Sequence, residues 1–288
     1  YTMRRRTKTT YRPSTWEEEA EAATDGDGMD VEERRSSASA SSSSSPSTCR
    51  ADGRDAASDL RPCYVRMGPV SAASGSAFLE VGLTKVVCSV FGPRANAAAD
   101  GFSGRGNLHC DFKFAPFARA GERTEAGQTD RERELSRQLQ QALLPAVRLT
   151  LYPKSTIDVF CLVLEDGGGA LPAAINCAAV ALVDAAVEML DTVAACAVCT
   201  TAAAATDQHH LSLLDPSHEE EAIAPAELTI SMMPSHQRVT HMEQTGELSP
   251  ALLCAALELA MGGCARVQAT LTASIVASAT ASAEAEGK

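Results

Sequence analysis

A strand, a glycine turn and a helix, all strongly apolar, follow one another directly in the middle of the sequence. In residues 155–165, STIDVFCLVLE, both faces of an alternating strand would carry apolar side chains. This pattern predicts a central strand buried on both faces. Three glycines stand at 167–169. Residues 173–190 are apolar nearly all round, which predicts a buried helix. Any fold for this chain has to enclose this unit.

Further strands and one helix are predicted before residue 155. Strands are predicted at the CYVRMG stretch, at SAFLEV and TKVVCSVF, and at residues 108–118. The pair SAFLEV and TKVVCSVF is joined by Gly82 and Leu83, a hairpin connection. Thr129 and Glu132 form a predicted capping box that begins a helix, and Pro145 is expected to end or kink that helix.

The second half repeats the order of strands followed by a helix. Strands are predicted at VAACAVCT, HLSLLD, LTISMMP and QRVTHMEQ, and a helix is predicted from Pro250 to about residue 278, capped by Ser249. This pattern indicates an α+β or α/β fold with a duplicated βα arrangement. The predicted organisation is a disordered acidic and Ser-rich tail at 1–50, a first half at 51–200, a second half at 201–280, and a frayed C-terminus at 281–288.

The charge balance excludes some functions. The net charge of −12 argues against nucleic-acid binding by charge alone, so any RNA contact needs a local basic patch or a partner's surface. No run of 18–20 uninterrupted apolar residues stands out, so no membrane span is expected. The Arg-rich MRRRTK start lacks the apolar segment of a secretory signal. Most of the ten cysteines fall inside apolar runs, as reduced buried thiols do.

The acidic segment DPSHEEE is the most interesting local candidate for chemistry. Asp215 ends a predicted strand, and Glu219, Glu220 and Glu221 follow on a predicted turn. Carboxylates grouped in this way either bind a divalent metal, act as acid and base, or form a solvated loop, which is the commoner case. The single pair Cys196 and Cys199 lacks the second pair of a structural zinc site and is interpreted as buried thiols.

Residues 112–154 form the only large segment with a net positive charge. Arg133 and Arg137 lie one turn apart on the predicted helix and therefore share a face, as residues four apart do. The candidates for RNA contact are Arg119, Arg131, Arg133 and Arg137. The alternative is an ordinary charged helix face on which Glu132 and Glu134 pair with the arginines.

The order of several motifs resembles the RNase PH family over about residues 51–275. The motifs are DGRDAASDLRP, GSAFLEVGLTKVVCSVFGPR, CDFKFAPFA, the long stretch from RERELSRQLQQ to DTVAAC, and LLDPSHEEE. Within the family, the chain is most similar to the eukaryotic exosome ring subunits of the non-catalytic mRNA-transport-regulator type. The resemblance implies an RNase PH-like α+β fold of duplicated βαβα-type units with mixed sheets and packed helices.

The resemblance also implies partners and a place in the cell. It implies a six-membered ring of RNase PH-like exosome subunits, S1/KH-type cap subunits, and single-stranded RNA in the ring's channel. The expected role is 3′-to-5′ RNA processing and degradation, including rRNA processing, in the nucleus, nucleolus and cytoplasm. No membrane, no cofactor and no metal is implied.

Active members of the family cut RNA with inorganic phosphate as the nucleophile, and a hydroxyl and an arginine bind that phosphate in a turn like ADGGTR or ADGGSR. The matching positions here are Gly169 and Ala170. Asp215 and Glu221 take the places of the family's acids. A lost arginine–phosphate contact costs about 1.5–3 kcal/mol, before the repulsion between phosphate and carboxylates is counted. We therefore expect no catalysis, with these four residues as vestigial positions.

Two enzymatic alternatives stay open at this point. One is an active phosphate-dependent 3′ exoribonuclease with a degenerate site, to which a neighbouring subunit supplies the missing cation. The other is a metal-dependent hydrolytic nuclease that uses Asp215, Glu219 and Glu221.

Overall fold

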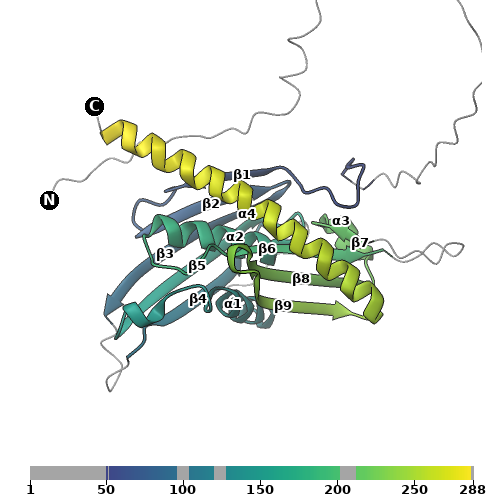
Figure 1. The fold of residues 1–288 in the computed structure, drawn as a ribbon, viewed down its shortest axis with the longest axis horizontal. Coiled ribbons are helices and arrows are strands. Elements are labelled where there is room, and N and C mark those ends of the chain that lie inside the picture. Colours follow the sequence, from purple (N-terminus) through teal and green to yellow (C-terminus); the bar gives the residue numbers. More distant parts are fainter. Residues whose placement is uncertain (1–49, 51, 96–103, 120–127, 202–211, 287–288) are drawn as a thin grey trace, which may run out of the picture.

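A computed structural model describes residues 50, 52–95, 104–119, 128–201 and 212–286. Its elements form two β-sheets, with helices packed between and along them (Figure 1). The predicted tail lies outside the described residues except for Arg50, which is buried. The predicted mixed α and β fold is confirmed.

The first sheet has five strands in the order β1-β2-β3-β5-β4. Their bounds are β1 Cys63–Met67, β2 Gly75–Val81, β3 Thr84–Ala95, β4 Asn107–Phe114 and β5 Ser155–Glu165. The β4–β5 pair is parallel and the other pairs are antiparallel, so the sheet is mixed. Gly82 and Leu83 join β2 and β3 as a tight hairpin, as predicted from their spacing.

Helices α1 (Asp130–Leu143) and α2 (Ala170–Asp184) pack on one face of this sheet. The capping box of Thr129 and Glu132 is present, and α1 ends just before Pro145, as predicted. Helix α2 begins and ends earlier than the predicted 173–190, and twelve of its fifteen residues are buried. A short 3₁₀ helix, η1 (Leu149–Leu151), connects the region after α1 to β5.

The prediction that β5 is buried on both faces is wrong. Ile157, Val159, Cys161 and Val163 are buried against α2 and the core, but Phe160 and Leu162 are each 40% exposed on the other face. β5 is central in the order of strands, between β3 and β4, yet no described helix covers its outer side. The apolar outer residues misled the sequence interpretation, because exposure depends on a covering layer and not on residue type alone.

The second sheet is antiparallel, in the order β7-β6-β8-β9. Its strands are β6 Ala194–Thr200, β7 Ser212–Leu214, β8 Ala226–Met233 and β9 Arg238–Gly246. Helix α3 (His218–Ile223) connects β7 to β8, and the short 3₁₀ helix η2 (Pro234–His236) connects β8 to β9. The acids predicted to lie on a turn, Glu219, Glu220 and Glu221, are therefore helical.

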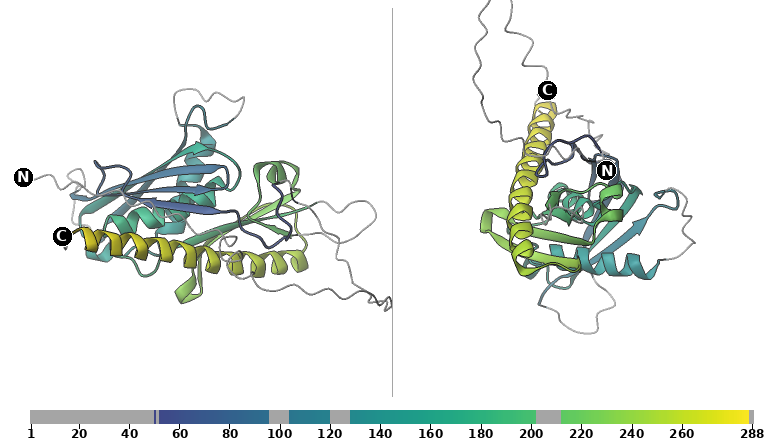
Figure 2. Two further views of the ribbon diagram at one scale, coloured as in Figure 1. Left: turned by 90° about the horizontal axis from the view of Figure 1, so that it is seen from above. Right: turned by 90° about the vertical axis from the view of Figure 1, so that its right-hand side faces the viewer.

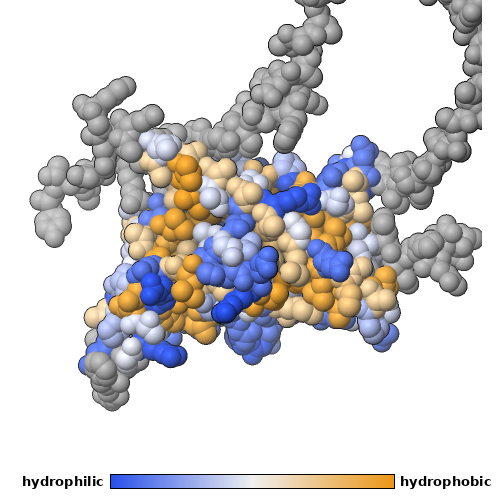
Figure 3. All heavy atoms as spheres, in the orientation of Figure 1, coloured by the Kyte–Doolittle hydropathy of each residue, from blue (hydrophilic) through white to orange (hydrophobic). Residues whose placement is uncertain are grey.

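Helix α4 (Pro250–Glu286) runs along both sheets (Figure 2). Ala256, Ala260 and Cys264 belong to the core of the second sheet, and Leu271 belongs to the core of the first. The helix continues to Glu286, beyond the predicted end near 278. The predicted frayed segment 281–288 stays a prediction. Apolar and polar residues are mixed on the face of the molecule seen in Figure 3. Met261 and Val276 of α4 are exposed apolar residues.

The expectation that no segment has the character of a membrane span needs correction for α4. The stretch Pro250–Thr280 is long and apolar enough to cross a bilayer by length and composition. One side of this helix, with Ala256, Ala260, Cys264 and Leu271, is buried against the two sheets, and most of the stretch is exposed.

Candidate functional site

The glycine turn lies between the end of β5 and the start of α2, and its backbone is held in the left-handed region. Gly168 has φ 99° and Gly169 has φ 62°. A Cβ at Gly168 would stand 2.5 Å from the backbone nitrogen of His218, the first residue of α3. Glycine is required here because the turn packs directly against the backbone of α3.

Arg61, which precedes β1, inserts its side chain into this turn. Its Nη2 donates to Asp215 Oδ1 at 2.6 Å and to the Gly168 carbonyl at 3.2 Å, and its Nη1 donates to the Gly167 carbonyl at 3.1 Å. Its backbone N–H donates to Asp215 Oδ2 at 2.9 Å. Burial lowers the pKa of Arg61, but the hydrogen bond and the charge of Asp215 outweigh burial and leave that pKa raised. The Asp215 carboxylate is therefore part of a buried ion pair.

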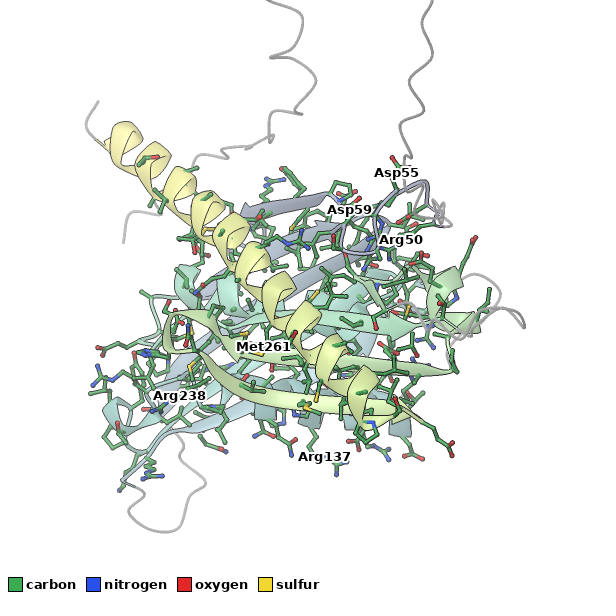
Figure 4. All side chains as sticks on the ribbon, turned by 45° about the vertical axis from the view of Figure 1, so that its right-hand side comes forward. Arg50, Asp55, Asp59, Arg137, Arg238 and Met261 are labelled. Atoms are coloured by element: carbon green, nitrogen blue, oxygen red, sulfur yellow. The ribbon has the colours of Figure 1, made fainter. Side chains whose placement is uncertain are left out.

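Two further arginines from the N-terminal segment reinforce this arrangement. Arg50 forms a buried ion pair with Glu220 at 2.8 Å, and Arg54 donates to the carbonyl of Asp215 at 2.8 Å (Figure 4 labels Arg50). The sequence interpretation missed Arg50, Arg54 and Arg61, because each lies more than 150 positions from the acid it contacts. The stretch DGRDAASDLRP, which carries part of the family resemblance, was the only signal for them.

Glu221 on α3 completes the turn from the other side. Its Oε1 accepts a hydrogen bond from the Gly169 backbone N–H at 2.5 Å. Burial raises the pKa of Glu221 to about 7, and the nearby Glu227 adds to this; the bond from Gly169 opposes the shift only in part. A backbone donor at the start of α2, the kind of group that holds a phosphate, is thus occupied by a carboxylate of the same chain.

A groove of about 620 Å³ opens beside the turn, between α1, α3, β8 and β9. Its charged lining contains more acids than bases: Glu134, Asp166, Glu221, Glu227 and Glu243 against Arg119 and Arg131. Burial, followed by the charge of Glu243, also raises the pKa of Glu227. Five acids against two arginines leave the lining of the groove with a net negative charge, so the groove is a poor environment for an anion.

The four predicted RNA-contact arginines do not form one patch. Arg119 pairs with Asp166 at 2.9 Å and lies over the Phe114 ring, while Arg131 lines the groove. Arg133 pairs with Asp130 at 2.5 Å, and Arg137 pairs with Glu134 and points away from the body of the protein (Figure 4). The pair of Arg137 with Glu134 is one that the charged-face alternative expected, whereas Arg133 pairs with Asp130 and Glu132 belongs to the capping box.

Other sequence candidates have plain structural roles. Cys196 and Cys199 are buried thiols, and burial raises the pKa of each. Among the described residues, no group of three or more His, Cys, Asp and Glu side chains is arranged to hold a metal ion. Of the three acids considered for such a site, Asp215 is paired with Arg61 and Glu221 accepts from the Gly169 N–H.

Both halves of the chain match domains of one family. Residues 59–188 match domain 1 of the RNase PH 3′ exoribonuclease family, and residues 194–263 match domain 2. The break between the two matches falls in the connection between α2 and β6, where the first sheet ends and the second begins.

Whole-chain comparisons agree with these matches. The chain is 42% identical to the human exosome complex component MTR3 over 242 residues, 80% of this chain and 87% of that protein. It is 35% identical to an RRP41-like exosome complex component of Arabidopsis thaliana, over 82% of this chain and 87% of that protein.

Solved structures have the same fold. Rice Rrp46 superposes with a TM-score of 0.66 at 22% identity, over 78% of this chain and 100% of that chain. A subunit of the Archaeoglobus fulgidus exosome with RNA bound to the active site gives a TM-score of 0.66 at 21% identity, over 77% and 92%. By both of its domains and by its relatives, this chain belongs to the RNase PH family of 3′ exoribonucleases.

Proposed function

We propose that this protein is a non-catalytic subunit of an RNA exosome ring that supports 3′-to-5′ RNA processing and degradation. Its similarity to exosome complex components over most of their length supports membership of such a complex. The proposed partners are other RNase PH-like subunits in a ring of six, S1/KH-type cap subunits, and single-stranded RNA in the channel. The proposed location is the nucleus and nucleolus, and also the cytoplasm.

The bond from the Gly169 N–H to Glu221 Oε1 is the observation that carries the non-catalytic role. A phosphate that approached this turn would have to displace a carboxylate of the same chain from that donor. It would also meet Asp166 and Glu227 in the same groove. The nearest buried cation, Arg61, already binds Asp215 and two glycine carbonyls.

The geometry of Gly169 supports the same conclusion. The family's active members have a hydroxyl side chain at this position, but here a Cβ would stand 2.8 Å from Arg61 Nη2. Arg61 therefore occupies the space that the hydroxyl residue needs. The loss of the Ser/Thr–Arg pair at Gly169 and Ala170 and the position of Arg61 are consistent with each other.

The test uses the assembled complex. The full-length tagged protein is captured from its source cells, co-purifying subunits are identified by mass spectrometry, and phosphate-dependent release of nucleoside diphosphates is measured. We expect RNase PH-like subunits to co-purify. Complexes that carry Asp215→Asn or Glu221→Gln should release products at the same rate as wild type, with thermal unfolding confirming that each variant is folded.

Two results would overturn the proposal. A tagged protein that captures no RNase PH-like subunit is not part of such a ring. A phosphorolysis rate that falls tenfold or more in a folded Asp215→Asn or Glu221→Gln complex would instead identify this chain as an active phosphorolytic exoribonuclease.

A further inference from the structure

The outer face of the five-stranded sheet is open. Helices α1 and α2 pack on the inner face, and no described helix lies on the other side (right-hand view of Figure 2). Strands β2, β3 and β5 present alternate residues to this outer face, while their inward residues, such as Val86 and Cys161, are buried. No element of the described chain therefore covers the outer surface of these three strands.

The centre of this face is apolar. Phe78 pairs with Val87 across β2 and β3, and Val87 pairs with Leu162 across β3 and β5, so the three side chains form one row. Beside this row, the rings of Phe91 and Phe160 meet edge to face at 5.8 Å. We call these five residues the apolar sheet face. Phe160 and Leu162 are exposed, and Phe78, Val87 and Phe91 are half-buried. Contiguous apolar surface with a polar rim is characteristic of protein–protein interfaces.

The charges around the apolar sheet face balance. Three ion pairs on its margin are internal to the sheet: Lys85–Glu165 at 2.7 Å, Arg94–Asp158 at 3.0 Å and Lys113–Asp111 at 3.0 Å. Arg66 and Glu80, on β1 and β2, add one charge of each sign. These named side chains are four basic and four acidic, in a chain whose net charge is −12.

This balance distinguishes between possible occupants. Exposed aromatic rings on a sheet are also a way to stack RNA bases, but RNA binding needs a surplus of cations for the phosphates. Here three of the four bases are already paired with acids of the same sheet. A neutral, flat, apolar face instead suits another flat apolar protein surface, and it lets an acidic chain approach its neighbour without net repulsion.

We propose that the apolar sheet face is the surface on which a neighbouring RNase PH-type subunit of the ring docks, through an apolar and locally neutral face of its own. This inference rests on the proposed function, because it assigns one ring contact to a place on the fold. It also explains why β5 has an apolar sequence on both faces: its outer residues become buried in the complex.

The first experiment places a charge in the centre of the face. Full-length tagged chains, wild type or Leu162→Arg, are captured from source cells, and co-purifying RNase PH-type subunits are quantified. Leu144→Arg is the matched control, because Leu144 at the end of α1 is 46% exposed and Leu162 is 40% exposed. We expect the Leu162→Arg chain to capture at least tenfold less of one RNase PH-type subunit than wild type does. The Leu144→Arg chain should capture the wild-type amount.

The outcomes separate the two proposals. If the wild-type chain captures no RNase PH-type subunit, the proposed function fails. If the wild-type chain captures them and folded Leu162→Arg captures them equally, only the docking surface is wrong.

A second experiment leaves the face nearly unchanged. A photo-crosslinking phenylalanine analogue replaces Phe160, and the crosslinked product is identified by mass spectrometry from the assembled complex. We expect a crosslink to a different RNase PH-type subunit. A crosslink to a second copy of this chain, to RNA, or to a protein outside the family would overturn the proposal, as would no crosslink in an intact complex.

Discussion

At Gly169, the local backbone conformation and the packing of a distant residue both disfavour a side chain. Its φ of 62° disfavours any side chain, and Arg61 fills the space that a side chain would need. A non-glycine residue in such a conformation costs on the order of 1–3 kcal/mol. Restoring the family's hydroxyl at this one position therefore acts against the present structure.

We predict that Gly169→Ser lowers the free energy of unfolding by more than Gly53→Ser does. Gly53 is a matched control, because its φ is 82° and a Cβ there would meet nothing within 4 Å. The backbone strain of about 1 kcal/mol or more is common to both, so the difference measures the contact with Arg61. Urea unfolding measures both, and equal losses would show that Arg61 moves aside without cost.

Glu221 makes stability depend on pH in an unusual direction. Its pKa in the folded protein, about 7, lies above the ordinary value of 4.5. The folded state therefore holds the proton more tightly than the unfolded state does. The stabilisation from this group is fully present below pH 4.5 and is lost as the pH rises through 7.

We predict that Glu221→Gln stabilises the protein at pH 8 relative to wild type, by on the order of 2 kcal/mol, and much less at pH 5. Gln keeps an oxygen that accepts from the Gly169 N–H and has no charge to bury. Urea unfolding of both proteins at the two pH values measures this. A variant that is equally destabilised at both would show that the carboxylate is needed as an anion.

At the scale of elements, the N-terminal segment before β1 connects the two halves of the fold. Arg61 joins the β5–α2 turn to Asp215 after β7, and Arg50 joins the same segment to Glu220 on α3. These contacts are buried, whereas the Arg94–Asp158 pair between β3 and β5 is exposed on its Arg side. Breaking a buried pair lowers the free energy of unfolding more than breaking an exposed pair, because it leaves an uncompensated buried charge.

We predict that Arg61→Ala costs about 3–5 kcal/mol of unfolding free energy, since the Asp215 carboxylate then keeps only the backbone N–H of residue 61 among the described donors. Arg94→Ala is the control and should cost less than about 1 kcal/mol. Chemical denaturation of the two variants gives both numbers. A small loss for Arg61→Ala would mean that water replaces the guanidinium and that the turn is not held by this pair.

At the scale of the whole molecule, the net negative charge opposes RNA binding. The net charge is −12, and Arg133 and Arg137 on α1 are each paired with an acid of the same helix. Exposed pairs of this kind are weak, so they can open when a phosphate backbone is near. The assembled complex is therefore the state in which these arginines are tested as RNA contacts.

We predict that replacing both Arg133 and Arg137 by Ala lowers the salt dependence of RNA binding by the assembled complex, by about 0.7 in slope for each lost contact. Arg148→Ala is the control, since Arg148 is also exposed and paired, with Glu188, but lies outside α1. Binding is measured at several salt concentrations. An unchanged slope would assign α1 to a protein contact or to solvent.

The sequence by itself determined the elements, because they depend on local signals. The capping box at Thr129, the hairpin at Gly82 and the nearly all-apolar sequence of α2 are local signals, and each predicted element was confirmed, α2 with earlier bounds. The proposal that the turn has lost its phosphate-binding side chains also starts from the sequence, which has Gly169 and Ala170 at those positions.

Only the tertiary structure decided what surrounds those residues. Arg61 is 154 positions from Asp215, and Glu221 is 52 positions from Gly169, so no local pattern reports either contact. The same holds for the open face of β5, where Phe160 and Leu162 have the composition of a buried strand but no described layer over them. Local free energies choose a strand or a helix, whereas burial and charge pairing depend on which distant segments the fold brings together.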